Sequence, residues 1–83
     1  MEIIKLVDEL PNKPSAWEIS RQIIRSSTSV GANNRASCRA KSTPDFINKL
    51  KIVEEEADET MYWLEILEES KLVDSSRVEL IRN

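Results

Sequence analysis

The sequence has little of the material that turns, disulfides and membrane spans require. Its 83 residues include one glycine, three prolines, one cysteine and no histidine. The scarcity of glycine and proline argues against an all-β fold, which needs many tight turns. Cys38 has no second cysteine to pair with, and no apolar run approaches the roughly 20 residues of a membrane helix. We expect a cytoplasmic protein, because the first ten residues also lack the pattern of a signal peptide.

The chain is short and unevenly charged. A domain of this length buries only about 60% of the surface that its unfolded form exposes, so a partner would add stability. The net charge of −3 argues against a surface built entirely for phosphate. Residues 19–51 nevertheless contain seven Lys or Arg and one acid, whereas residues 52–83 contain ten acids and three bases. We expect one domain, residues 1–83, with a basic and an acidic region.

The first half of the chain predicts two helices. "EIIKLVDELP" has apolar residues at helical spacing and stops at Pro11, so the first helix is short. Ser15 and Glu18 form a capping-box pattern that would start the second helix. Its bundle-facing stripe is predicted to comprise Ala16, Ile19, Ile23, Ser27, Val30 and Asn34.

The second half predicts a long helix and a short one. In "KSTPDF", Ser42 or Thr43 can cap a third helix that should run to about Ser70. Ser76 and Glu79 again have capping-box spacing and would open a short fourth helix. Short connections place successive helices beside each other, so we predict an all-α, antiparallel up-and-down four-helix bundle with short first and fourth helices. The predicted core comprises Ile23, Val30, Phe46, Leu50, Val53, Ala57 and Leu64.

Two narrower apolar seams lie beside the main stripes. On the second helix, Trp17, Ile24 and Gly31 are spaced seven residues apart. Large aromatic residues away from the core stripe are typical of subunit interfaces. We therefore predict an oligomer interface formed by Trp17, Ile24, Gly31, Ile52, Trp63 and Ile66.

A basic ridge is predicted on the side of the second helix opposite its core stripe. It comprises Arg21, Arg25, Arg35 and Arg39 and continues to Lys41. Lys49 and Lys51 could add to its contacts. Such a ridge can contact phosphates in a salt-dependent way. The alternative is pairing with the acidic residues of the third helix, within or between subunits, where each exposed pair contributes at most about 1 kcal/mol.

No catalytic constellation is evident. The acidic run "EEEADE" lacks the histidines that accompany carboxylates in di-iron bundles, so we interpret it as a solvated face and predict no metal or cofactor. Cys38 and the serines lack a histidine base, and one glycine cannot build a phosphate loop. We predict a non-enzymatic protein without a small-molecule substrate.

Gly31 lies in "TSVGANN", inside a predicted helix. A glycine there costs about 1 kcal/mol relative to alanine, which a close approach by another helix or a bulky side chain would offset. The alternative interpretation is that Gly31 ends the helix as its C-cap.

Three ordered motifs between Arg25 and Leu67 resemble a known family. They are an S-V-x-A-N block, an S-x-x-D-F block and an E-A-x-E-T-x-Y-W-L run. The matching residues are Ser29, Val30, Ala32 and Asn33; Ser42, Asp45 and Phe46; and Glu56, Ala57, Glu59, Thr60, Tyr62, Trp63 and Leu64. The chain thus resembles the four-helix bundle family first noticed in intervening sequences of bacterial large-subunit ribosomal RNA genes.

The resemblance implies an up-and-down bundle that assembles as a homopentamer and has no assigned biochemical role. One relative is a basic accessory partner of a reverse transcriptase and binds nucleic acid. Compared with longer relatives, the first helix would begin late and the fourth would stop early, and apolar surface left exposed would then be covered by a neighbouring chain. We predict an oligomeric assembly module; the alternative is a nucleic-acid-binding accessory protein that uses the basic ridge.

Overall fold

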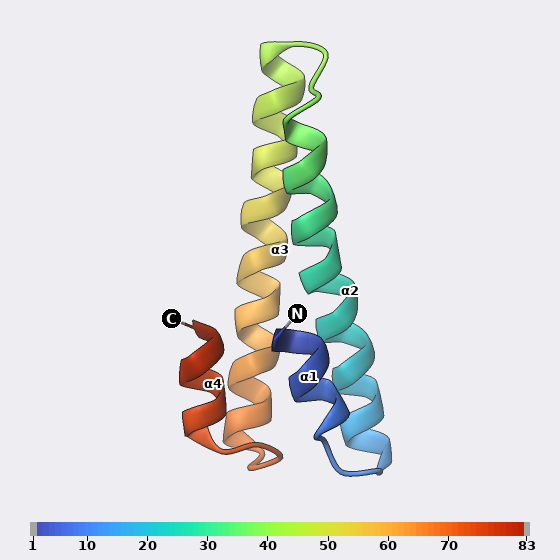
Figure 1. The fold of residues 1–83 in the computed structure, drawn as a ribbon, viewed down its shortest axis with the longest axis vertical. Helices are drawn as coiled ribbons and strands as arrows, with labels where there is room; N and C mark the ends of the chain where they lie inside the picture. The colour runs from blue at the N-terminus through green and yellow to red at the C-terminus, as the bar shows by residue number, and fades with distance from the viewer. Residues whose placement is uncertain (1, 83) are drawn as a thin grey trace.

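The structure is a computed structural model that describes residues 2–82, in which every regular element is a helix. The helices are α1 (Glu2–Asp8), α2 (Pro14–Ser37), α3 (Thr43–Glu69) and α4 (Ser75–Arg82). Figure 1 shows α2 and α3 side by side and running in opposite directions, so that they form a long hairpin. The all-α four-helix fold expected from the sequence is confirmed.

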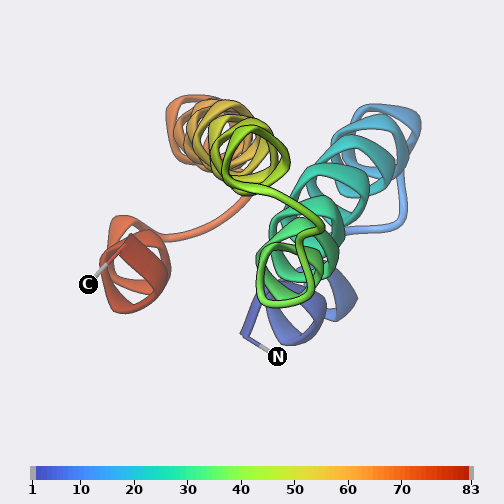
Figure 2. The same ribbon diagram turned by 90° about the horizontal axis from the view of Figure 1, so that it is seen from above.

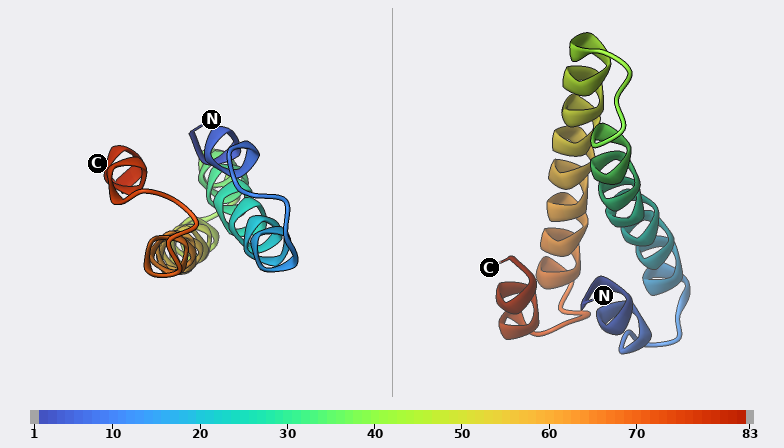
Figure 3. Two further views of the ribbon diagram at one scale, coloured as in Figure 1. Left: turned by 90° about the horizontal axis from the view of Figure 1, so that it is seen from below. Right: turned by 45° about the horizontal axis from the view of Figure 1, so that its top comes forward.

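The two short helices pack at one end of this hairpin. Viewed along the long axis, the four helices occupy the corners of a square in chain order (Figure 2). Contacts join α1 to α2, α2 to α3, α3 to α4, and α4 back to α1. The molecule measures 44 × 23 × 18 Å, and the end of the hairpin that carries the α2–α3 turn projects beyond α1 and α4 (Figure 3).

The hydrophobic core lies entirely at the end where four helices meet. Its fully packed members are Ile3, Leu6, Ile23, Leu64, Leu67 and Val78, which come from all four helices. Ile23 and Leu64 were predicted as core from the sequence, and both are confirmed. Among residues 28–63, all of which the structure describes, only Ser37 is buried. We call the hairpin end packed against α1 and α4 the covered half, and residues 28–58 the bare half.

The other predicted core residues lie in the bare half and are not buried. Three of them are half-buried and two, Phe46 and Leu50, keep 42% and 40% of their surface exposed. The helical spacing of these residues was identified correctly, but a core also needs a second layer. Since α1 has seven residues and α4 has eight, neither reaches this level of the hairpin. The prediction was therefore wrong for Val30, Phe46, Leu50, Val53 and Ala57.

The start of α3 follows the sequence prediction. Ser42 has the extended backbone of an N-cap, and its hydroxyl accepts a hydrogen bond of 3.2 Å from the Asp45 amide. The Asp45 carboxylate accepts one of 3.2 Å from the Lys41 amide in return. The first contact satisfies a backbone donor that the helix start leaves unpaired, and the second fixes the residue that precedes the cap. The predicted end near Ser70 is also confirmed, because Ser70 is the C-cap of α3.

The predicted capping boxes of α2 and α4 are wrong. Helix α2 begins at Pro14, so Ser15 lies inside it, and the N-cap residue Lys13 makes no side-chain capping bond. Proline fits the first helical turn because its backbone conformation is already helical and it has no N–H to satisfy. Helix α4 begins at Ser75, which places Ser76 inside it as well. In both helices the serine of the predicted capping box is therefore the second helical residue and not the N-cap.

The turn after α3 has a backbone feature that the sequence does not announce. Lys71 adopts a left-handed conformation with a φ of 60°. The Lys71 amide donates to the Glu68 carbonyl and the Leu72 amide to the Leu67 carbonyl, each at 3.1 Å. This is a Schellman motif, in which glycine is the usual residue at the left-handed position. The motif turns the chain so that Leu72 packs against the core.

Candidate functional site

The predicted seam on α2 is open to solvent. Trp17 is 57% exposed, and its indole N–H donates a hydrogen bond of 2.7 Å to the Asn12 side chain. Ile24 is half-buried and Gly31 is exposed. Gly31 lies inside α2, which continues to Ser37, so the alternative that it ends the helix is wrong. A Cβ atom built on Gly31 meets nothing within 4 Å, so no close approach within this chain explains the glycine.

The predicted strip on α3 is less exposed than the seam on α2. Its three members, Ile52, Trp63 and Ile66, are all half-buried. Trp63 packs against the core and makes an edge contact with Tyr62, with ring centroids 5.0 Å apart. Its indole N–H donates a 3.4 Å hydrogen bond to Glu59. Trp63 therefore has a role within the protomer, whereas Trp17 projects from it.

Two arginines of the predicted ridge are paired with acids. Arg21 binds Glu18 one turn earlier on α2, at 2.7 Å. Arg25 reaches across to α3, where it binds Glu56 at 3.3 Å and also forms an ion pair with Glu59. The prediction that Arg25 lies on the side away from the bundle is therefore wrong, because this side chain ties the two long helices together.

These ion pairs lower the pKa values of the carboxylates that they contact. The hydrogen bond from Arg25 lowers the pKa of Glu59, and the Trp63 indole acts in the same direction. The hydrogen bond from Arg21 similarly lowers the pKa of Glu18. Both carboxylates are partly exposed, so water weakens these attractions.

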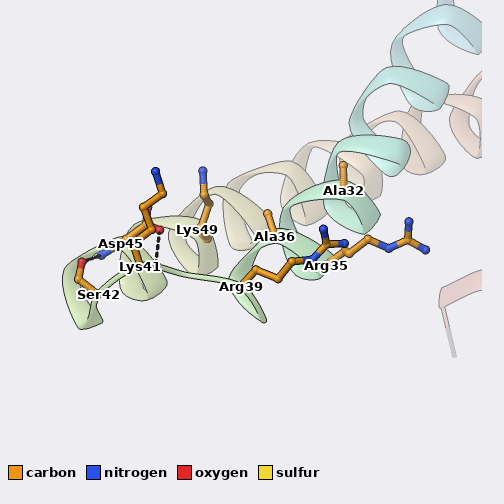
Figure 4. A pocket seen from close by; sticks show the side chains of 8 residues that line it. All are labelled: Ala32, Arg35, Ala36, Arg39, Lys41, Ser42, Asp45 and Lys49. Carbon is orange, nitrogen blue, oxygen red and sulfur yellow. Dashed lines mark hydrogen bonds between the residues drawn. The ribbon is translucent and has the colours of Figure 1, made fainter.

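The rest of the ridge lies at the tip of the hairpin and is unpaired. Arg35 lies in the last turn of α2, while Arg39 and Lys41 lie in the turn that follows. None of these three makes an ion pair within the described residues 2–82, and the same holds for Lys49. The four cations line an open hollow of about 630 Å³ together with Ala32, Ala36, Ser42 and Asp45 (Figure 4). We call Arg35, Arg39, Lys41 and Lys49 the basic tip.

Asp45, the one acidic residue that lines the hollow, already accepts a backbone hydrogen bond. Asp45 accepts the hydrogen bond from the Lys41 amide and sits in the first turn of α3, where a carboxylate is stabilised by the helix dipole (Figure 4). The basic tip thus keeps an excess of positive charge that this chain does not neutralise. All four residues were named from the sequence as possible phosphate contacts, but together with Arg21 and Arg25. Their separation from those two arginines depends on the tertiary structure, which the sequence pattern does not reveal.

The residues of the acidic run lie on different sides of α3. Glu56 and Glu59 face α2 and bind Arg25, as described above. Glu54, Glu55 and Asp58 are exposed, and no ion pair is formed by them within residues 2–82. We call these three residues the acidic flank. In the part of the chain that the structure describes, no group of three or more His, Cys, Asp or Glu is arranged to hold a metal ion.

The one cysteine of the chain lies at the surface. Cys38 is exposed at the end of α2 and its thiol lies near the Asn34 carbonyl, at 3.7 Å. Within residues 2–82, none of the helices combines the length and the hydropathy that crossing a bilayer requires. The features available for function are therefore surfaces: the α2 seam, the bare half, the basic tip and the acidic flank.

Comparison with known proteins assigns the family. A solved structure from Bacteroides thetaiotaomicron, described as a protein of unknown function from the S23 ribosomal protein family, is 44% identical to this chain. The two superpose with a TM-score of 0.87 over 95% of this chain and 73% of the other. No curated protein matches the chain. The sequence profile of the 23S rRNA-intervening sequence proteins matches residues 1–83, and the chain belongs to that family.

Proposed function

We propose that this protein is a non-enzymatic assembly module that works as a homo-oligomer. The observation that carries the proposal is the amount of apolar surface that one protomer leaves uncovered. Seven large hydrophobic residues are at least 40% exposed, namely Ile4, Trp17, Phe46, Ile47, Leu50, Tyr62 and Leu80. Three of them, Phe46, Ile47 and Leu50, lie within five residues of one another on α3. Exposed apolar residues that cluster in this way mark interaction sites in soluble proteins.

The α2 seam is the part of this surface that a neighbouring chain would use. Trp17 offers a large exposed ring, and aromatic residues supply much of the binding energy at interfaces. Gly31 offers a place where a neighbour can approach the helix backbone, since nothing in the protomer occupies that space. The predicted interface of Trp17, Ile24, Gly31, Ile52, Trp63 and Ile66 remains our proposal. The family resemblance noted from the sequence implies five copies in a ring.

Size-exclusion chromatography with light scattering tests the oligomer. We expect a defined oligomer at micromolar concentration and a shift toward smaller species for Trp17→Ala. Leu80→Ala is the matched control, because Leu80 is 69% exposed on α4 but lies outside the seam. A wild-type protein that elutes as a clean monomer would contradict the proposed function.

Gly31→Ala separates protomer stability from assembly. The new methyl group has free space within the chain, so the protomer should gain about 1 kcal/mol of stability from helix propensity. Assembly should weaken if a neighbouring helix lies against this position. Chemical denaturation at low concentration and light scattering at high concentration measure the two effects. Assembly unchanged by Gly31→Ala would remove Gly31 from the interface.

Nucleic-acid binding is the second candidate, and the unpaired basic tip is the observation that favours it. With Arg21 and Arg25 held by acids, contacts to phosphate would involve chiefly Arg35, Arg39 and Lys41. Titration with a fluorescent RNA at two salt concentrations tests it, because phosphate contacts predict a steep loss of affinity as salt rises. No binding at low salt would eliminate this candidate.

A further inference from the structure

The basic tip and the acidic flank have complementary charges but cannot meet within one protomer. Glu56 faces α2, where it binds Arg25. Two residues along a helix correspond to a rotation of about 200°, so Glu54 and Asp58 project from nearly the opposite side of α3. By the same geometry, Arg35 projects away from the side of α2 that buries Ser37. The two charged surfaces therefore lie on outward-facing parts of the hairpin.

We propose that the basic tip of one protomer docks on the acidic flank of a second copy of this chain. The inference rests on the proposed oligomer and names the charged contact within it. The tip offers two guanidinium and two ammonium groups around an open hollow. The flank offers carboxylates at Glu54 and Asp58, four residues apart and hence neighbours on one helix face.

Charge distribution favours a second copy over a polyanion as the partner of the tip. Residues 52–70 contain eight Asp or Glu and no Lys or Arg, and only two of these acids are neutralised by Arg25. A nucleic acid that reached the tip would have this negative surface beside it on the same hairpin. A second copy instead supplies the carboxylates that the tip lacks, and its own tip remains free for a third copy.

The geometry of such a contact determines the type of assembly. Two different surfaces meet, so the contact is heterologous, and repeating it gives a closed ring when the rotation between copies closes. Arginine forks recognise carboxylates with two parallel hydrogen bonds, so Arg35 and Arg39 can fix the angle between neighbours. Electrostatic contacts of this kind set orientation and association rate more than total affinity.

Charge reversal tests the contact, with light scattering as the measurement. We expect Arg35→Glu with Arg39→Glu to weaken assembly about tenfold or more, and Glu54→Lys with Asp58→Lys to do the same. The chain with all four substitutions exchanges the charges at the two arginine positions and the two flank positions, while Lys41, Lys49 and Glu55 are unchanged, so much of its assembly should recover. Recovery also shows that the reversed surfaces have not unfolded the protein.

Matched controls change the same net charge elsewhere. Lys13→Glu with Lys71→Glu lowers the charge as much as the tip reversal, and both lysines are exposed far from the tip. Glu65→Lys with Glu69→Lys raises the net charge as much as the flank reversal does, and both residues are exposed near the C-terminal end of α3. Both control variants should assemble like the wild type, and high salt should weaken wild-type assembly.

Other outcomes overturn the inference in distinguishable ways. A wild-type oligomer that is insensitive to the reversals leaves the proposed function intact but removes this contact. A quadruple variant that does not reassemble shows that the two surfaces do not meet. If RNA binds the wild type at low salt, and if only the tip reversal abolishes this binding, the tip is a phosphate site. A monomeric wild type defeats the proposed function itself.

Discussion

The covered and bare halves of the hairpin are built from the same two helices but differ in what packs on them. In the covered half, α1 and α4 add a second layer, and Ile23, Leu64 and Leu67 become fully buried. In the bare half the apolar stripe continues along α2 and α3, yet Phe46 and Leu50 remain exposed. The comparison shows that amphipathic spacing specifies which face is apolar, whereas burial depends on a partner layer at the same height.

The largest expected difference between the halves lies in leucine truncation. Leu64→Ala removes a fully buried side chain from the four-helix core and should cost about 3 kcal/mol of unfolding free energy. Leu50→Ala removes a side chain that is 40% exposed, so the protomer should lose about 1 kcal/mol or less. Urea unfolding followed by circular dichroism measures both. Equal losses at concentrations where the protein is dissociated would show that Leu50 is buried within the protomer, which would contradict the structure.

The same two variants, Leu50→Ala and Leu64→Ala, report on assembly when the protein concentration is raised. If a neighbouring chain covers the bare half, the cost of Leu50→Ala should grow with protein concentration, because folding and association are linked. The cost of Leu64→Ala should change less, since its environment is complete within one chain. A Leu50→Ala penalty that is independent of concentration would place the subunit contacts elsewhere.

A smaller effect is expected at the helix starts. Ser42 caps α3 at the bare end, and Ser42→Ala should destabilise the protein by about 1 kcal/mol. Ser15 has the same sequence pattern at the covered end but lies inside α2, so Ser15→Ala should be near neutral. Thermal unfolding of the two variants compares them directly. A similar loss for both would mean that Ser15, not Lys13, starts the helix.

How far the sequence determined these features depends on the range of the interactions. Helix number, the apolar stripes and a cap of α3 at Ser42 or Thr43 come from contacts within four residues, and these were predicted. The capping boxes of α2 and α4 are equally local but were placed wrongly. The exposure of Phe46 depends on where α1 and α4 end in space, which spacing along α3 does not reveal. The division of the basic ridge depends on Arg25 meeting α3 and on the turn that places Lys49 at the tip. The sequence had left phosphate contact and pairing with acids open for these arginines. The structure pairs Arg21 and Arg25 with acids and leaves Arg35 and Arg39 without an ion pair within residues 2–82.

The smallest expected effect concerns the Arg25 contact near the boundary of the two halves. Its hydrogen bond lowers the pKa of Glu59, so the pair stabilises the folded state above the usual carboxyl pKa and loses this contribution as pH falls through the lowered value. Arg25→Met should therefore reduce stability at neutral pH, and this loss should shrink as pH falls through the lowered pKa of Glu59. Arg21→Met is the control, because Arg21 binds Glu18 within α2 and does not join two helices. If the two variants lost the same amount of stability at neutral pH, the bridge between α2 and α3 would add nothing beyond a local helix pair, and the bare half would be held together by its half-buried side chains alone.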